Sequence, residues 1–310
     1  MSLDPQANEI LKEALASGLP PVYTLTVGAA RERMHNAFIN KGEKEELDEI
    51  REYSIPSPGY QLRVRVYSPI SSKKLPCLIF YHGGGWTLND LDTHDNLCRS
   101  ISKHSETVVV SVDYRLAPEF KYPAANEDAY TSLLWTFFNS SQLNIVPSKI
   151  AVGGDSSGGT QAAVVCLLSR DRGGPKIAFQ WLTYPVTDYY LPGTKSYLDF
   201  ERGYSMNRDF MIWFWNNYLP LNFNRDDPYL FPLRATSFNN LPPAFIMTAN
   251  YDPLRDEGEL YGEKLMSAGG HVKVKRYEDQ MHGFLLQRHR IDNANKAFFD
   301  LIDEIKNALQ

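Results

Sequence analysis

Length, composition and charge are those of a globular chain and exclude several classes of protein. The 310 residues are 43% hydrophobic and 22% charged, which leaves no reason to expect disorder. The formal net charge of −5, with an isoelectric point near 5.8, provides no basic surface for nucleic acid or for anionic membranes.

The N-terminal residues 1–50 predict two amphipathic helices that form a cap segment. Apolar residues recur at helical spacing in both stretches. They are Ile10, Leu11, Ala14 and Leu15 in the first stretch, and Val27, Ala30, Met34 and Phe38 in the second. The charged tract 41–52 is interpreted as a solvated connector to the rest of the chain.

The remainder, 51–310, predicts one α/β domain with a mostly parallel sheet. Residues 61–67 alternate between apolar and polar side chains, as in a half-exposed antiparallel strand. Later apolar runs lack this alternation, which is typical of strands covered by helices on both faces. These runs are 77–81, 107–112, 149–152 and 244–247, and helical patterns lie between them at 126–138, 160–169 and 257–268. Active sites in such sheets lie at the carboxyl ends of the strands.

Residues 188–230 interrupt the alternation of strands and helices. Ser205 is a candidate N-cap for a helix with Met211, Phe214, Trp215 and Tyr218 at helical intervals. Aromatic stripes of this kind more often pack in a core than bind a ligand. We interpret the region as an insertion that joins the N-terminal helices in a cap. In this cap, Met211, Phe214 and Trp215 are expected to line the substrate pocket and limit the acyl chain.

The strongest chemical signal is Gly-x-Ser-x-Gly centred on Ser156, between an apolar strand and a helix. A serine on a tight strand-to-helix turn exposes its hydroxyl, and small neighbours permit the strained backbone that this needs. The amides at the N-terminus of the following helix also favour developing negative charge. The context therefore predicts Ser156 as a nucleophile.

A run of three glycines, Gly83 to Gly85, follows the predicted strand 77–81. Unobstructed amides there can stabilise an oxyanion, and each such donor contributes about 2.7–4 kcal/mol in other enzymes. We predict the amides of Gly83, Gly84 and Ser157 as the donors, with His82 as a structural residue. A phosphate-binding loop is the alternative, but no Gly-Lys-Ser/Thr follows.

The order serine, acid, histidine, typical of α/β-hydrolases, places the remaining catalytic residues near the C-terminus. Asp252 follows the apolar run 244–247, and His282 follows an alternating segment that ends at Tyr277. An ordinary histidine titrates near pH 6.5 and can accept the serine proton, while a carboxylate on its other nitrogen fixes the tautomer. The alternatives to Asp252 are Asp256, Glu257 and Asp279. Four other histidines are expected to be solvated surface groups, namely His94, His104, His271 and His289.

Several motifs together resemble the bacterial hormone-sensitive-lipase-like carboxylesterases of the α/β-hydrolase superfamily, from about residue 60 to the end. They are HGGGW at 82–86, DYRLAPE at 113–119, GDSSGG at 154–159, DPLRD at 252–256 and HGF at 282–284. The resemblance implies an eight-stranded sheet, a helical cap, and hydrolysis of short- to medium-chain acyl esters without a metal or other cofactor. Family members often form homodimers. The residue after the nucleophile is commonly alanine, and here it is Ser157; Trp86 is expected to narrow the substrate pocket.

An amidase or formamidase with the same triad, and a binding protein on the same fold, are the alternative functions. The presence of His282 argues against the binding protein. The expected partner is a small-molecule ester, without nucleic acid and without membrane insertion, because no apolar stretch is long enough to cross a bilayer. The cysteines Cys77, Cys98 and Cys166 cannot all pair, which favours a cytoplasmic location.

Overall fold

A single eight-stranded sheet organises the chain in the computed structural model, which describes residues 2–39, 41–42, 44–57 and 59–309. The strands are β1 (Glu49–Ser57), β2 (Tyr60–Ser68), β3 (Leu75–Tyr81), β4 (Val108–Asp113), β5 (Ile145–Asp155), β6 (Phe179–Thr183), β7 (Ala244–Tyr251) and β8 (Val272–Met281). Their spatial order is β1-β2-β4-β3-β5-β6-β7-β8. β1 and β2 pair antiparallel, as do β2 and β4, while all other neighbours pair parallel. The predicted fold class is confirmed.

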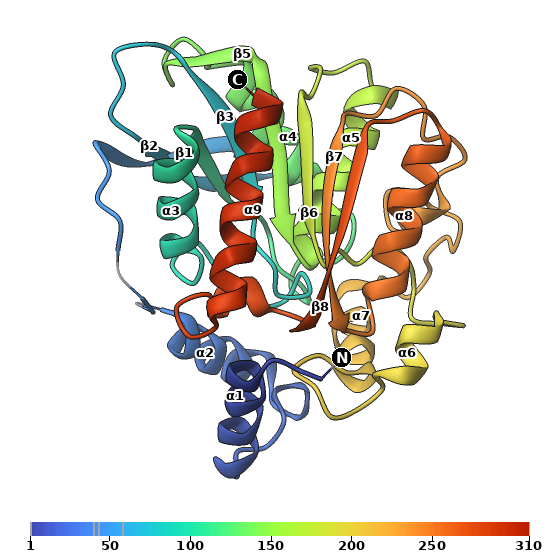
Figure 1. Ribbon diagram of the computed structural model, residues 1–310. Helices are drawn as coiled ribbons and strands as arrows, with labels where there is room; N and C mark the ends of the chain where they lie inside the picture. The colour runs from blue at the N-terminus through green and yellow to red at the C-terminus, as the bar shows by residue number, and fades with distance from the viewer. Residues whose placement is uncertain (1, 40, 43, 58, 310) are drawn as a thin grey trace.

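Helices cover both faces of this sheet (Figure 1). On one face lie α3 (Asp95–Ser105) and α9 (Asp292–Leu309), and on the other lie α4 (Ala124–Phe138), α5 (Ser157–Asp171) and α8 (Arg255–Ser267). The parallel strands bury both faces because each crossover returns through a helix. None of the helices in the described ranges is long and apolar enough to cross a membrane.

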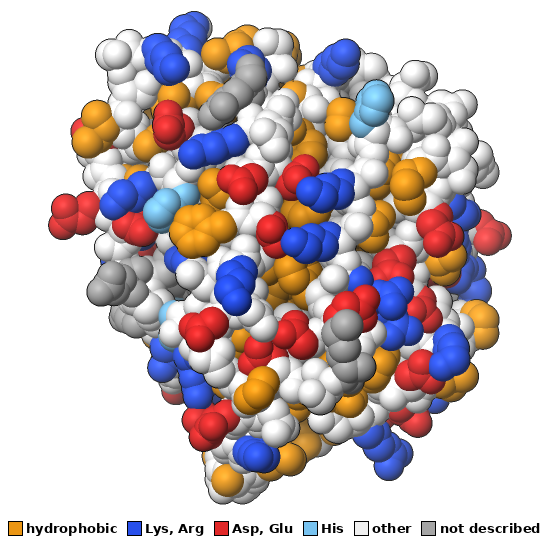
Figure 2. All heavy atoms as spheres, in the orientation of Figure 1, with side chains coloured by type: hydrophobic (Ala, Val, Ile, Leu, Met, Phe, Trp, Pro, Cys, Tyr) orange, Lys and Arg blue, Asp and Glu red, His pale blue; other side chains and the backbone are white. Residues whose placement is uncertain are grey.

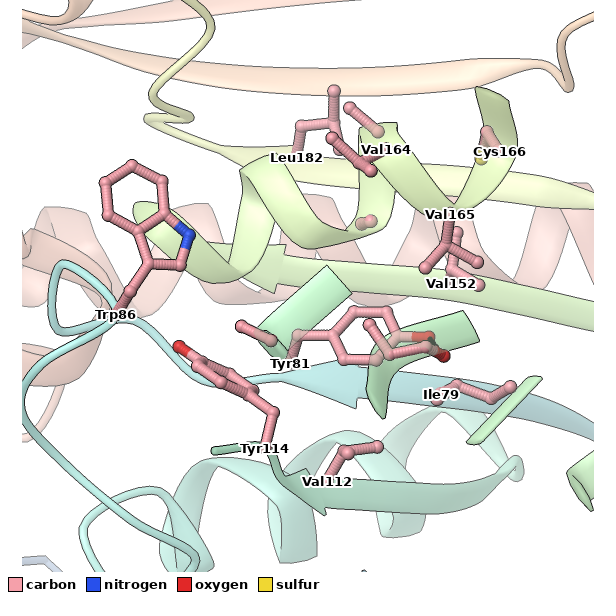
Figure 3. Packing of buried hydrophobic residues seen from close by; sticks show 14 of the residues in the cluster. Ile79, Tyr81, Trp86, Val112, Tyr114, Val152, Val164, Val165, Cys166 and Leu182 are labelled. Atoms are coloured by element: carbon pink, nitrogen blue, oxygen red, sulfur yellow. Dashed lines mark hydrogen bonds between the residues drawn. The ribbon is translucent and has the colours of Figure 1, made fainter. Parts of the chain in front are cut away.

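Alternate residues of the central strands build two separate cores. In β3, Leu78 and Phe80 contribute to the core under α3 and α9, whereas Ile79 and Tyr81 contribute to the core under α5. Figure 3 shows this second core, where Ile79 and Tyr81 lie among side chains from β5 and α5. Because a strand presents successive side chains to opposite faces, an unbroken apolar run is what such a position requires.

Two strands were not anticipated from the sequence. β1 begins at Glu49, inside the tract expected to be a solvated connector, and it pairs with β2 through its whole length. The predicted boundary at residue 50 therefore falls inside a strand. β6, the other unanticipated strand, is only five residues long.

Two segments distant in sequence lie at the end of the sheet where β5, β6 and β8 point (Figure 1). One is N-terminal and contains α1 (Pro5–Ala16), the short 3₁₀ helix η1 (Val22–Thr24) and α2 (Val27–Phe38). The other lies between β6 and β7 and contains α6 (Lys195–Asp199), α7 (Arg208–Tyr218) and the 3₁₀ helix η2 (Pro232–Arg234). Tyr23 of η1 contacts Phe210 of α7, with ring centroids 5.7 Å apart.

α1 packs away from this contact, against the C-terminal part of the chain. Asp4 caps α1 by accepting from the amide of Gln6 at 2.7 Å, and its own amide donates to the carbonyl of Asp279 at 2.8 Å. Ala7 is fully buried in the core that contains α9. On the face shown in Figure 2, charged side chains of both signs are interspersed.

Candidate active site

Ser156 lies on the turn between β5 and α5, in a backbone conformation that few residues adopt. Its φ is 55° and its ψ is −123°, so the turn stores strain that the surrounding structure must hold. The small neighbour Gly158 makes this possible, since a Cβ there would lie 1.9 Å from the carbonyl oxygen of Tyr81. The turn therefore lies directly against the end of β3, and Ser156 lines a pocket at this end of the sheet.

Three side chains predicted from separate loops meet at this turn. His282 Nε2 lies 3.1 Å from Ser156 Oγ, and His282 Nδ1 lies 2.7 Å from Asp252 Oδ2. Asp252 is fully buried, and its other oxygen accepts from the amide of Leu254 at 2.9 Å. His282 and Ser156 are only 8% and 6% exposed. One ring nitrogen thus faces the hydroxyl while the other is held by a fixed carboxylate.

The three alternative acids have other partners. Asp256 accepts from the Ser196 amide at 2.8 Å, and Asp279 accepts from the Asn293 side chain at 2.7 Å. Glu257 is buried, and its Oε1 accepts from the amide of Thr187 at 2.8 Å. Burial raises the pKa of Glu257 well above its ordinary value, and the negative charges of nearby aspartates act in the same direction.

In the glycine loop after β3, one of the three predicted oxyanion donors has another partner. The amide of Gly83 donates to Asp155 Oδ1 at 2.9 Å, so this N–H is already used inside the protein. The amides of Gly84, Gly85 and Ser157 donate no hydrogen bond to any part of the chain that the structure describes. Gly84 and Gly85 also line the pocket at the nucleophile, whereas Gly83 does not. The prediction is wrong for Gly83, and the Gly85 amide is a candidate in its place.

The hydroxyl of Ser157 joins the nucleophile turn to the glycine loop. Its Oγ accepts from the amide of Trp86 at 3.2 Å, and the residue is fully buried. The sequence singled out this position because alanine is common there in the resembling family. The structure gives the hydroxyl a partner, the Trp86 amide, in the loop 71 residues earlier.

A buried polar cluster lies behind the glycine loop. His94 Nε2 is 3.2 Å from Asp155 Oδ1, and both residues are buried. Burial alone would raise the pKa of Asp155, but the attraction of His94 and the hydrogen bond from the Gly83 amide lower it. His82 is also buried and stacks on Tyr114 with centroids 4.4 Å apart, as expected for a structural residue.

The prediction that four other histidines are solvated is wrong for His94, because it is the partner of Asp155. His271 and His289 are exposed, as expected, and His104 is half-buried. His104 Nε2 lies 3.1 Å from Glu45 Oε1.

A pocket of about 130 Å³ opens at Ser156, and of the predicted substrate-binding residues only Phe214 lines it. Trp86, Met211 and Trp215 are buried elsewhere. Trp86 stacks on Tyr218 with centroids 4.2 Å apart, so its indole belongs to the packing beneath the cap. The other apolar side chains that line the pocket are Met34, Phe38, Leu88, Tyr184, Met206, Phe210 and Leu286.

The sequence contained a signal for some of the pocket residues but misplaced the cap of α7. Met34 and Phe38 already formed the apolar face of a predicted helix, which needs a partner surface. Ser205, predicted as an N-cap, instead lines the pocket and donates to the carbonyl of His282 at 2.7 Å. Asn207 caps α7, accepting from the amide of Phe210 at 2.9 Å.

The strand order, the strained serine turn and the Ser–His–Asp contacts define a serine hydrolase of the α/β-hydrolase class. A sequence profile of the alpha/beta hydrolase fold family matches residues 78–286. The chain belongs to this family, and within it to the hormone-sensitive-lipase-like carboxylesterases.

Relatives with known names agree with this assignment. Carboxylesterase NlhH of Mycobacterium tuberculosis is 39% identical over 293 residues, 91% of this chain and 89% of that protein. Carboxylic ester hydrolase LipN of the same organism is 44% identical over 243 residues, 76% of this chain and 64% of that protein. The solved structure of a hyperthermophilic esterase from Pyrobaculum calidifontis superposes with a TM-score of 0.93 at 37% identity, covering 99% of each chain.

Proposed function

We propose that this chain is a serine carboxylesterase that hydrolyses short- to medium-chain acyl esters through an acyl-enzyme intermediate. The observation that carries the proposal is the continuous contact from Ser156 Oγ to His282 Nε2 at 3.1 Å, and from His282 Nδ1 to Asp252 Oδ2 at 2.7 Å. The names of the relatives, which are carboxylesterases and esterases, support the same reaction.

In the first half of the reaction, Ser156 Oγ attacks the ester carbonyl while its proton passes to His282 Nε2. Asp252 holds the imidazole in the tautomer that can accept this proton and stabilises the imidazolium that forms. The carbonyl oxygen becomes an oxyanion, which the amides of Gly84, Gly85 and Ser157 stabilise as hydrogen-bond donors.

Collapse of the tetrahedral intermediate breaks the bond to the alcohol oxygen, and the imidazolium returns its proton to that oxygen. In the second half, the imidazole takes a proton from water as the water oxygen attacks the acyl-serine ester. Collapse then releases the carboxylic acid and returns the proton to the serine oxygen. Each half therefore uses the same base and the same donors, without a metal or cofactor.

The size and lining of the pocket support small substrates. A dry apolar cavity of about 150 Å³ holds a molecule the size of benzene, and the pocket at Ser156 measures about 130 Å³. Phe210, Phe214 and Met206 give it an apolar wall. A butyryl group fits such a volume, which favours short acyl chains as substrates.

The experiment is turnover of p-nitrophenyl butyrate by the wild type and by Ser156→Ala and His282→Ala. Loss of either group should lower kcat by several orders of magnitude with little change in the thermal unfolding temperature, because a triad acts as a unit. Near-normal turnover in either variant would contradict the proposal. Matched acyl esters and anilides, assayed side by side, decide between this reaction and that of an amidase or formamidase.

Further parts of the assignment are proposals of the same kind. Within the predicted cap segment 1–50, we interpret η1 and α2 as one cap with residues 188–230, supported by the contact of Tyr23 with Phe210 and by the pocket lining from Met34, Phe38 and Phe214. The remainder of the segment belongs elsewhere, because α1 packs on the core that contains α9 and β1 begins at Glu49. A cytoplasmic location is supported by the three buried cysteines, none of which forms a disulfide. A homodimer, and the lack of a nucleic-acid partner, stay predictions from the resemblance and from the acidic net charge.

A further inference from the structure

Asn89 has an unusual backbone conformation at the wall of the active-site pocket. Its φ is 70°, in the left-handed region where asparagine is among the few tolerated residues other than glycine. It lines the pocket together with Gly84 and Gly85. Its side chain, however, turns back toward the glycine loop.

The side-chain amide of Asn89 binds the carbonyl oxygen of Gly83. Asn89 Nδ2 donates to this oxygen at 3.1 Å, and His82 Nδ1 lies 2.8 Å from the same atom. A carbonyl can only accept, so the His82 nitrogen facing it carries a proton. The two side chains therefore occupy both lone pairs of the Gly83 carbonyl.

Fixing this carbonyl also fixes the direction of the Gly84 amide. The two groups belong to one planar trans peptide unit, in which the C=O and the N–H point in opposite directions. When Asn89 and His82 hold the carbonyl on one side, the Gly84 N–H is directed to the other. Gly84 is one of the proposed oxyanion donors.

The other two proposed donors are held differently. The peptide that carries the Gly85 N–H has its carbonyl, Gly84 O, bound by the amides of Thr87 at 3.1 Å and Leu88 at 2.8 Å. The peptide that carries the Ser157 N–H has its carbonyl, that of the nucleophile, bound by the Thr160 amide at 3.1 Å.

The Gly85 peptide is held by backbone amides alone, and the Ser157 peptide is held by a backbone amide together with a longer contact from the Thr160 hydroxyl at 3.4 Å. The carbonyl of the Gly83–Gly84 peptide, by contrast, is held only by the side chains of Asn89 and His82. Flanking glycines have no Cβ to restrict rotation of this unit.

We propose that Asn89 is a positioning residue of the oxyanion hole, whose side-chain amide orients the Gly84 N–H toward the developing negative charge. The proposal rests on the esterase function proposed above. Asn89 acts through the peptide and leaves ground-state binding of the ester unchanged. Its removal should therefore lower kcat with little effect on KM.

The experiment compares Asn89→Asp and Asn89→Gly with the wild type on p-nitrophenyl butyrate. Asn89→Asp keeps the shape but replaces the donor with an acceptor; Asn89→Gly suits the left-handed backbone and introduces no charge. Complete loss of one oxyanion donor costs about 100- to 1,000-fold in kcat, so misorientation should cost less. We expect kcat to fall about 10- to 100-fold in Asn89→Asp and about tenfold in Asn89→Gly.

Inhibition by an alkyl trifluoromethyl ketone provides a second measurement. Ser156 adds to this ketone to form a hemiketal whose oxyanion occupies the same donors, so its Ki should rise by the factor by which kcat falls. The matched control is Asn144→Asp. Asn144 also has a positive φ of 53°, and its Nδ2 faces the Lys73 carbonyl oxygen at 3.4 Å on an exposed loop. Its kcat and Ki should equal those of the wild type.

The outcomes separate this proposal from the esterase function. Wild-type kcat and Ki in both Asn89 variants would overturn the positioning role while leaving the esterase intact. A loss in Asn89→Asp alone would also overturn it, because the effect would then come from the added charge. If Asn89→Asp does not fold, Asn89→Gly decides. Lack of ester turnover in the wild type would instead contradict the esterase function.

Discussion

The buried hydroxyl of Ser157 has a structural task beside the nucleophile. It accepts from the amide of Trp86 at 3.2 Å, and Trp86 is itself fully buried. A buried backbone N–H without an acceptor costs about 1–3 kcal/mol. An alanine at this position would leave the Ser157 backbone amide in place but remove the acceptor for the loop.

We therefore expect Ser157→Ala to lower the free energy of unfolding by about 1–3 kcal/mol, while ester turnover falls much less than in Ser156→Ala. Chemical denaturation and p-nitrophenyl butyrate turnover measure the two effects. The control is Thr136→Val, because the buried Thr136 hydroxyl has no hydrogen-bond partner in the described chain. That variant should be as stable as the wild type or more so. Equal stability of Ser157→Ala and the wild type would contradict the role of the hydroxyl.

The residues of the triad could be predicted from sequence because their positions follow from local patterns. A serine between glycines after an apolar strand, and loops after two later strands, were enough to find Ser156, Asp252 and His282. The error at Gly83 arose because its amide is occupied by Asp155, 72 residues away. His94 was misjudged for the same reason, since its partner lies far along the chain.

Helices and strands could be predicted where their apolar pattern was long. They were harder to predict where contacts with other elements determine whether a segment forms a strand or which way a helix faces. β3 and β5 were found from unbroken apolar runs, whereas β1 lies at the edge of the sheet and is mostly exposed or half-buried. In α7 the sequence showed an aromatic stripe but not its orientation. Phe214 faces the pocket and Trp215 packs inside the cap, a distinction that depends on the elements on either side of the helix.

This difference along α7 predicts that substitution of Phe214 changes the acyl preference, whereas substitution of the neighbouring Trp215 changes the stability. Phe214→Ala enlarges the pocket, so turnover should shift toward longer acyl chains in a series of p-nitrophenyl esters. Trp215 contacts Trp86 and Phe231, with centroids 4.8 and 5.4 Å away. Trp215→Ala should cost about 3–5 kcal/mol of stability while leaving the acyl preference unchanged. A shifted preference in Trp215→Ala, or none in Phe214→Ala, would contradict this assignment.

At the scale of the whole molecule, a buried carboxyl joins the insertion after β6 to the catalytic part of the sheet. Glu257 is the third residue of α8 and lies close in sequence to Asp252. Its Oε1 accepts from the amides of Thr187 at 2.8 Å and Asp188 at 3.3 Å. Its Oε2 is buried without a partner among the described residues. Because this group is buried in the folded chain and hydrated in the unfolded chain, its ionisation affects the free energy of unfolding.

The raised pKa of Glu257 makes its contribution to stability depend on pH. A carboxyl whose pKa is higher in the folded than in the unfolded state gives stability that is present below the unfolded pKa, and that is lost as pH rises through the folded pKa. Each unit of pKa difference corresponds to about 1.4 kcal/mol. The wild type should therefore lose stability from this group between weakly acidic and alkaline pH.

Glu257→Gln removes this titration and keeps a carbonyl oxygen that can accept from Thr187. We expect its Tm, relative to the wild type, to rise between pH 5 and pH 8 by several degrees, since about 1 kcal/mol corresponds to about 2 °C at this chain length. Thermal unfolding across this pH range measures the difference. Glu263→Gln, at an exposed position of the same helix, is the control and should show a constant difference. A Tm difference for Glu257→Gln that stays flat with pH would mean that the buried carboxyl titrates alike in the folded and unfolded chain.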